Sequence, residues 1–72
     1  MDEVTALTRF GLRLRALREK AGLSQEELAE RAQVHRTYLS GIERGRRNPS
    51  LINLLRIARA LNFSISDLFE EV

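Results

Sequence analysis

Apolar residues recur every three or four positions along most of the chain, which is the spacing of one face of an α-helix. The first such stripe comprises Leu7, Phe10, Leu14, Leu17 and Ala21. Gly22 follows it, and glycine commonly takes the left-handed conformation that ends a helix. The pattern therefore predicts a first helix that buries this stripe and ends near residue 21.

A second helix begins at the sequence "SQEE". Ser24 is followed three residues later by Glu27, and such a pair forms a capping box at the N-terminus of a helix. The expected buried residues of this short helix are Leu28, Ala29 and Ala32. The sequence "AQV", which begins with Ala32, is expected to separate this helix from the next one.

A third helix is predicted from about His35 to Arg44, with Gly45 as its stop. Leu39 and Ile42 lie three positions apart and would face the core. The opposite side would then carry Arg36, Thr37, Ser40 and Arg44.

Two more helices follow Pro49. Ser50 is the expected cap of the fourth, Asn62 its left-handed exit, and its inward residues are predicted to be Leu51, Leu54, Leu55, Ala58 and Leu61. Ser64, with Asp67 three residues on, opens a last short helix that carries Leu68 and Phe69. No segment alternates with a period of two, so we expect an all-α fold of five helices without a sheet.

Length and composition limit what this domain can do. The 72 residues, 43% of them apolar, predict a single domain over residues 1–72 with a small core and no deep active-site pocket. The chain has no cysteine and one histidine, His35, which argues against a disulfide framework and a metal site. No signal peptide and no apolar run of about 20 residues occur. We expect a cytoplasmic protein without cofactor, small-molecule ligand or membrane partner.

The net charge of +2 is unevenly distributed. Residues 1–30 have a net charge of −1 and residues 60–72 a net charge of −3. Residues 31–59 carry seven arginines against one acid, Glu43, for a net charge of +6. A basic middle between acidic ends favours a face that binds a polyanion, although a solvated arginine-rich surface is the alternative.

Two short helices joined by a tight turn, the second one basic, are typical of a helix-turn-helix, here over about residues 24–44. The segment "LRLRALREKAGLSQEELAERAQVHRTYLSGIERGRRNPSLINLLRIARAL" resembles the DNA-binding domain of the phage Cro/repressor (Cro/C1-type, XRE-like) family. The resemblance covers about residues 8–70 and implies the compact five-helix bundle of the lambda-repressor-like type. Within that family, "RTYLSGIERGRRN" in a short chain is most similar to controller proteins of restriction–modification systems.

The resemblance implies a role for each residue that matches the family's motif. Base contacts in the major groove are implied for Arg36, Thr37 and Ser40. Backbone contacts are implied for Gln25, Arg44, Arg46, Arg47 and Asn48. We expect backbone contacts from His35 and Tyr38 as well, on the chemistry of their side chains. Gln25 would meet a phosphate at the electropositive start of its helix.

The chemistry of the base-contact positions suits this role independently. The planar fork of Arg36 can bond guanine O6 and N7 together, and the methyl group of Thr37 can contact the methyl group of thymine. Gly41 would leave no side chain between helix and groove.

Three of the assigned roles have an alternative. His35 contacts DNA or is a tolerated surface residue, Tyr38 stacks on the sugar–phosphate backbone or covers the core edge, and Arg47 enters the minor groove instead of following the backbone.

Five residues are expected to bear on the scaffold or the outer surface rather than on recognition. Gln33 stands where this family commonly has glycine in the turn, so we expect it to be left-handed at a cost on the order of 1 kcal/mol. The family resemblance suggests a partly buried ion pair between Arg18 and Glu43, with two unrelated surface charges as the alternative. Arg56 and Arg59 are expected to be solvated, with DNA contacts as the alternative.

A homodimer is expected because one recognition helix reads too few base pairs for useful specificity. Dimers of this kind place two recognition helices about 34 Å apart on a palindromic operator. The predicted dimer surface lies on the fourth and fifth helices, about residues 50–71, at Phe63, Ile65, Phe69 and Val72. Phe69 is also predicted to fill the core, and some of the remaining surface of this apolar cluster is expected to face the partner.

The leading hypothesis is a dimeric, sequence-specific regulator of transcription that binds double-stranded DNA. Its narrower form is an autoregulatory controller of a restriction–modification operon. The alternative is a protein-interaction module, such as an antitoxin or a coactivator-like adaptor. An adaptor would not need Arg36 and Thr37 on the outward side of the third helix. We do not expect an enzyme, because the sequence has no nucleophile–base pair at matching spacing and no glycine-rich phosphate loop.

Overall fold

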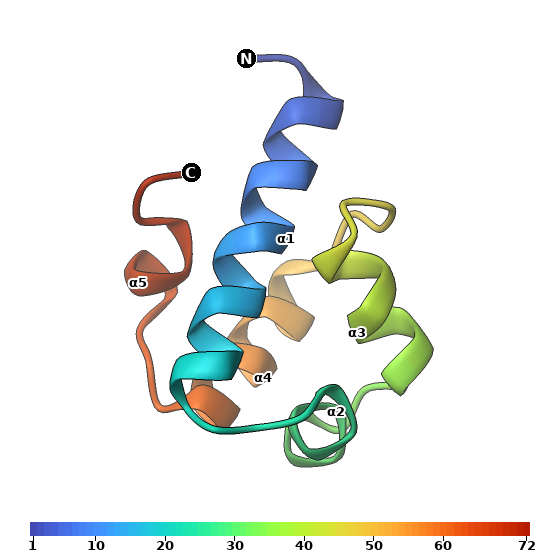
Figure 1. Cartoon of the computed structure of the whole chain (residues 1–72), viewed down its shortest axis with the longest axis vertical. Helices are drawn as coiled ribbons and strands as arrows, with labels where there is room; N and C mark the ends of the chain where they lie inside the picture. Colours follow the sequence, from blue (N-terminus) through green and yellow to red (C-terminus); the bar gives the residue numbers. More distant parts are fainter.

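Five helices and no strand make up the protein in a computed structural model that describes residues 1–72. Their bounds are α1 (Glu3–Lys20), α2 (Gln25–Ala32), α3 (Arg36–Glu43), α4 (Leu51–Leu61) and α5 (Ile65–Phe69). The long α1 lies between α3 and α5, with α4 behind it and α2 at its C-terminal end (Figure 1). The prediction of an all-α, five-helix fold is therefore confirmed. None of the helices has the length and apolar character that a membrane crossing requires.

Serine side chains start three of these helices where the sequence predicts. The Oγ atoms of Ser24, Ser50 and Ser64 each accept a hydrogen bond from a backbone N–H three residues on. At α2 and α5 a carboxylate returns the bond and completes a capping box. These bonds lower the pKa of Glu27 and of Asp67, so the caps are intact above the ordinary carboxyl range and weaken as pH falls.

The core forms where all five helices meet. Its most completely buried side chains are Leu14, Leu28, Leu39, Ile42, Ile57 and Leu68. Two of the residues that were predicted to be buried along the first and fourth helices are not, because Ala21 is exposed and Leu51 is 65% exposed. The buried stripe of α4 is instead Leu54, Ile57, Ala58 and Leu61, which is rotated by part of a turn from the predicted one.

Gly11 brings the backbones of α1 and α3 into direct contact. A Cβ atom at this position would overlap the carbonyl oxygens of Ile42 and Glu43. Any larger residue would therefore force α3 away from α1. On the other side of α1, the guanidinium of Arg13 donates to the Asp67 carbonyl at 2.9 and 3.1 Å and holds α5.

The turn between α2 and α3 confirms the expected strain at Gln33. This residue has φ 59° and ψ 43°, a left-handed conformation that disfavours residues with a Cβ. We predict that Gln33→Gly raises the free energy of unfolding in urea by a few tenths to about 1 kcal/mol. Gln33→Ala, which keeps the Cβ, is the control and should not stabilise. A less stable Gln33→Gly protein would contradict the prediction.

Candidate nucleic-acid interface

Helix α3 separates a buried side from an exposed one. Leu39 and Ile42 are 0% and 1% exposed and attach the helix to the core. Arg36 and Thr37, in the first turn, are exposed, and Ser40 is half-buried one turn later. The three predicted base-contact residues therefore come from one stretch of α3, and the two most exposed are at its N-terminal end.

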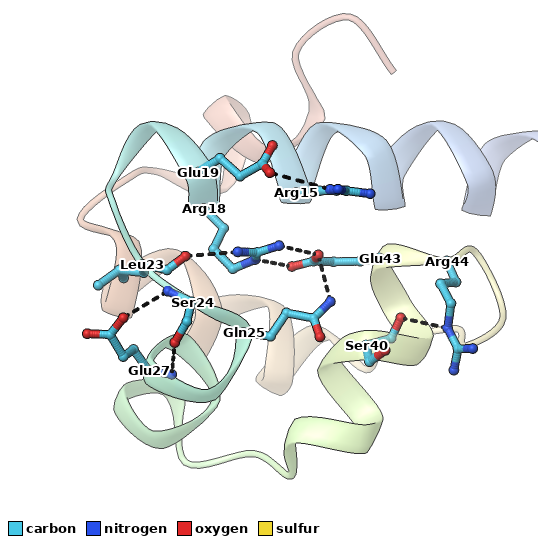
Figure 2. A network of polar contacts seen from close by, with 10 residues as sticks. All are labelled: Arg15, Arg18, Glu19, Leu23, Ser24, Gln25, Glu27, Ser40, Glu43 and Arg44. Carbon is cyan, nitrogen blue, oxygen red and sulfur yellow. Dashed lines mark hydrogen bonds and ion pairs between the residues drawn. The ribbon is translucent and has the colours of Figure 1, made fainter.

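A buried ion pair joins the C-terminal end of α3 to α1. Arg18 donates through Nε to Glu43 Oε2 at 2.7 Å and through Nη2 to Oε1 at 2.9 Å. Its third nitrogen donates to the Leu23 carbonyl at 2.8 Å, so Figure 2 shows the guanidinium between two acceptors. The side chains are 10% and 2% exposed. The predicted ion pair is confirmed, and the hydrogen bonds to Glu43 raise the pKa of Arg18.

Gln25 connects the start of α2 to this ion pair. Its Nε2 donates to Glu43 Oε1 at 3.0 Å, and the side chain is half-buried (Figure 2). The side-chain amide is therefore held in one orientation, and its phosphate contact stays a prediction. The backbone N–H groups at this N-terminus add the positive end of a helix dipole.

The basic residues around α3 have no acidic partner. The ion pairs of the protein join Arg13 to Glu70, Arg15 to Glu19 and Arg18 to Glu43. None involves the exposed residues Arg36, Arg44, Arg46 and Arg47. Arg44 makes one long bond, from Nε to the Ser40 carbonyl at 3.4 Å. Their charge is therefore available to a polyanion.

His35 and Tyr38 differ in how freely they can approach a ligand. His35 is the exposed N-cap of α3, and its side chain makes no capping bond. Tyr38 is half-buried, and its hydroxyl accepts a hydrogen bond from Asn53 Nδ2 at 3.2 Å. Tyr38 thus covers the core edge toward α4 and still exposes part of its ring. The link to Asn53 carries no signal in the sequence, because α3 and α4 are distant along the chain at this point.

One expectation about α3 is wrong. Gly41 was expected to leave no side chain between the helix and the groove, but it is buried, and a Cβ added there would lie 2.6 Å from Arg47 Cγ. The loop after α3 folds back, so the stem of Arg47 covers the helix at this glycine. Arg46 and Asn48, its neighbours in the loop, are exposed.

Arg56 and Arg59 are exposed on α4, as expected. They share a shallow surface hollow with Arg31 of α2, a grouping that the sequence analysis missed. Arg56 and Arg59 are three residues apart on α4, but Arg31 is distant from them in the chain, and only the packing of α2 on α4 brings it next to them.

The predicted dimer residues lie along the C-terminal end of the fold. Phe63, Ile65 and Val72 are half-buried against the core. Phe69 was predicted to fill the core, but it is 46% exposed. Its ring lies 5.0 Å from that of Phe10, centroid to centroid. Both Phe69 and Val72 border an apolar groove with Leu7 and Leu54. Leu68 takes the buried side of α5 at 0% exposure, and Phe69, as the next helical residue, points about 100° away from it.

Comparisons with known proteins agree with this geometry. Residues 14–68 match the family described as "Helix-turn-helix". Control protein C.MunI of Mycoplasma sp is 48% identical over 65 residues, which cover 89% of this chain and 88% of that protein. Control protein C.BamHI of Bacillus amyloliquefaciens is 47% identical over 62 residues, which cover 85% of this chain and 76% of that protein.

The fold is also similar to solved structures. The restriction–modification controller protein C.AhdI from Aeromonas hydrophila has a TM-score of 0.86 and 51% sequence identity, covering 88% of this chain and 96% of that one. Family, sequence relatives and fold agree with the exposed, unpaired basic residues around a firmly held α3. The chain therefore belongs to the XRE-like helix-turn-helix family of DNA-binding transcriptional regulators.

Proposed function

We propose that this protein is the dimeric controller of a restriction–modification operon, which binds a palindromic operator and regulates its own transcription. The observation that carries the proposal is the exposure of two polar side chains in the first turn of α3. Arg36 and Thr37 are exposed there without an intramolecular partner, on a helix whose other end is held by the buried Arg18–Glu43 pair. The similarity to controller proteins C.MunI and C.AhdI supports the choice of operon.

In this proposal the side chains divide into two groups. Arg36, Thr37 and Ser40 contact base edges in the major groove, where base pairs differ in their donor and acceptor patterns. Contacts with the sugar–phosphate backbone come from Gln25, His35, Tyr38, Arg44, Arg46, Arg47 and Asn48. Backbone contacts set the position of the protein on DNA and contribute little sequence information.

The test is to select bound sequences from random double-stranded DNA and to measure the footprint. A palindrome whose half-sites are about one helical turn apart is the expected result. Equal binding of all sequences would exclude a sequence-specific regulator and leave a protein-interaction module as the explanation of the fold. A single, non-repeated half-site would contradict the dimer while leaving sequence recognition intact.

The proposed dimer surface comprises Phe63, Ile65, Phe69 and Val72. We predict a dimer at micromolar concentration in sedimentation. Phe69→Asp should weaken both association and operator binding, because a buried, unpaired carboxylate costs several kcal/mol. Since Phe69 is 46% exposed, the monomer should keep its helical circular dichroism.

Leu12→Asp is the matched control for the dimer. It places the same charge on an apolar residue of α1 that is 59% exposed and lies outside the proposed surface, so association should be unchanged. A protein that stays monomeric at high concentration and binds DNA as a single unit would contradict the dimer. The C-terminal cluster would then stabilise the fold only.

A further inference from the structure

The place of a side chain at position 41 of α3 is filled by a residue from outside the helix. The three atoms nearest to a Cβ built on Gly41 all belong to Arg47, namely Cγ at 2.6 Å, Nε at 3.5 Å and Cδ at 3.6 Å. A real Cβ does not approach another carbon as closely as 2.6 Å. The absence of a side chain at Gly41 is therefore what admits the stem of Arg47.

Two further contacts hold the loop in this position. The backbone N–H of Arg46 donates to the Gly41 carbonyl at 2.8 Å, which ties the loop to α3 one residue before Arg47. Gly45 has φ 73°, and a Cβ there would lie 2.9 Å from Thr8 Cα, so the loop also lies directly on α1. Because the backbone is held next to Arg47, its Cγ cannot move far without a change of rotamer.

Position 41 lies on the side of α3 that is proposed to face DNA. It follows Thr37 by four residues, and residues four apart are neighbours on one face of a helix. Thr37 is exposed, and the Nε of Arg47 lies next to the following turn. The guanidinium of Arg47 therefore starts from the surface of α3 and not from the outer edge of the loop.

We infer that Gly41 is a positioning residue that places Arg47 across the DNA-facing side of α3, where Arg47 acts as a base-contacting side chain of the recognition helix. This inference rests on the proposed function and moves Arg47 from the backbone-contact group to the base-contact group. Arginine suits the position because its fork bonds guanine at two atoms. Recognition then depends on the loop and the helix together, through the pair Gly41 and Arg47.

The test is a double-mutant cycle on Gly41→Ala and Arg47→Ala, with affinity measured on operator and scrambled DNA. Each single variant should lose about tenfold in operator affinity, the amount expected for one bidentate base contact, and less on scrambled DNA. The double variant should bind like Arg47→Ala alone, because that change removes all three atoms that a Cβ at position 41 would meet.

Arg46→Ala provides the matched control. Arg46 is a neighbouring loop arginine whose side chain is not among the three nearest contacts of Gly41. The factors by which Arg46→Ala and Gly41→Ala lower operator affinity should therefore multiply in the double variant. Thermal unfolding without DNA gives a second measurement. In the Arg47→Ala background, Gly41→Ala should raise the Tm, because alanine is a better helix former than glycine.

Three outcomes would overturn the inference. Losses from Gly41→Ala and Arg47→Ala that multiply would show that the two residues act independently. An equal loss on operator and scrambled DNA for Arg47→Ala would return Arg47 to the backbone-contact group. A lack of sequence preference in the unmodified protein would remove the proposed function and the inference with it, and this result is visible before any variant is made.

Discussion

Arg18→Ala is expected to lower the free energy of unfolding by about 3–5 kcal/mol, because it leaves the Glu43 carboxylate buried without its cation. The carboxylate is 2% exposed and would keep only the bond from Gln25. Glu43→Ala should have a comparable effect, since the Arg18 guanidinium would keep only the Leu23 carbonyl. The double variant should cost less than the sum of the two single changes, as measured by urea unfolding.

Arg15→Ala is the matched control for this cycle. Arg15 pairs with Glu19 at 3.6 Å on the same helix, but both side chains are more than half exposed. Exposed pairs contribute about 0–1 kcal/mol, so this variant should remain close to the unmodified protein. Strictly additive effects of Arg18→Ala and Glu43→Ala would show that the buried pair is not an energetic unit.

Arg36→Ala is expected to weaken operator binding by about 1–3 kcal/mol and to remove the base preference at one position of each half-site. The reason is its place in the first turn of α3, exposed and without an acidic partner. The measurement is binding to the operator, to operators changed at single positions and to scrambled DNA, over a series of salt concentrations.

Arg59→Ala removes the same charge from α4, outside the proposed interface, and should leave base preference unchanged. If Arg36→Ala removed a phosphate contact in place of a base contact, the slope of log affinity against log salt would fall by about one. If Arg36→Ala weakens operator and scrambled DNA equally, Arg36 contacts the backbone and base recognition lies elsewhere on α3.

Features that depend on neighbouring residues in the chain could be predicted from the sequence. The capping boxes at Ser24 and Ser64 need two residues three apart, and the left-handed turns at Gln33 and Asn62 follow the end of a periodic stripe. In α4 the periodicity was ambiguous, because Leu51, Leu54, Leu55 and Ile57 offer two overlapping stripes. Only the packing against α2 and α5 selects the one that contains Ile57.

The candidate interface was predictable only in part. The exposed residues of α3 follow from its register once Leu39 and Ile42 face the core. The position of Arg47 does not follow from the register of α3, because it depends on the path of a loop that packs on Gly41 and on Thr8 of α1. The exposure of Phe69 was missed for a similar reason, since α5 is too short for its periodicity to define a buried side.

The backbone contact at Gly11 has a consequence for the motions of α3. Because the carbonyls of Ile42 and Glu43 touch α1 with no side chain between them, α3 cannot slide or tilt by itself. The amide protons of Ile42 and Glu43, in the C-terminal half of α3 that contacts α1, should therefore exchange with solvent far more slowly than those of the exposed first turn. We therefore expect α3 to need no rearrangement on binding DNA. Diffusion and charge would then set the association rate, and wrong sites would differ from the operator mainly by a higher dissociation rate.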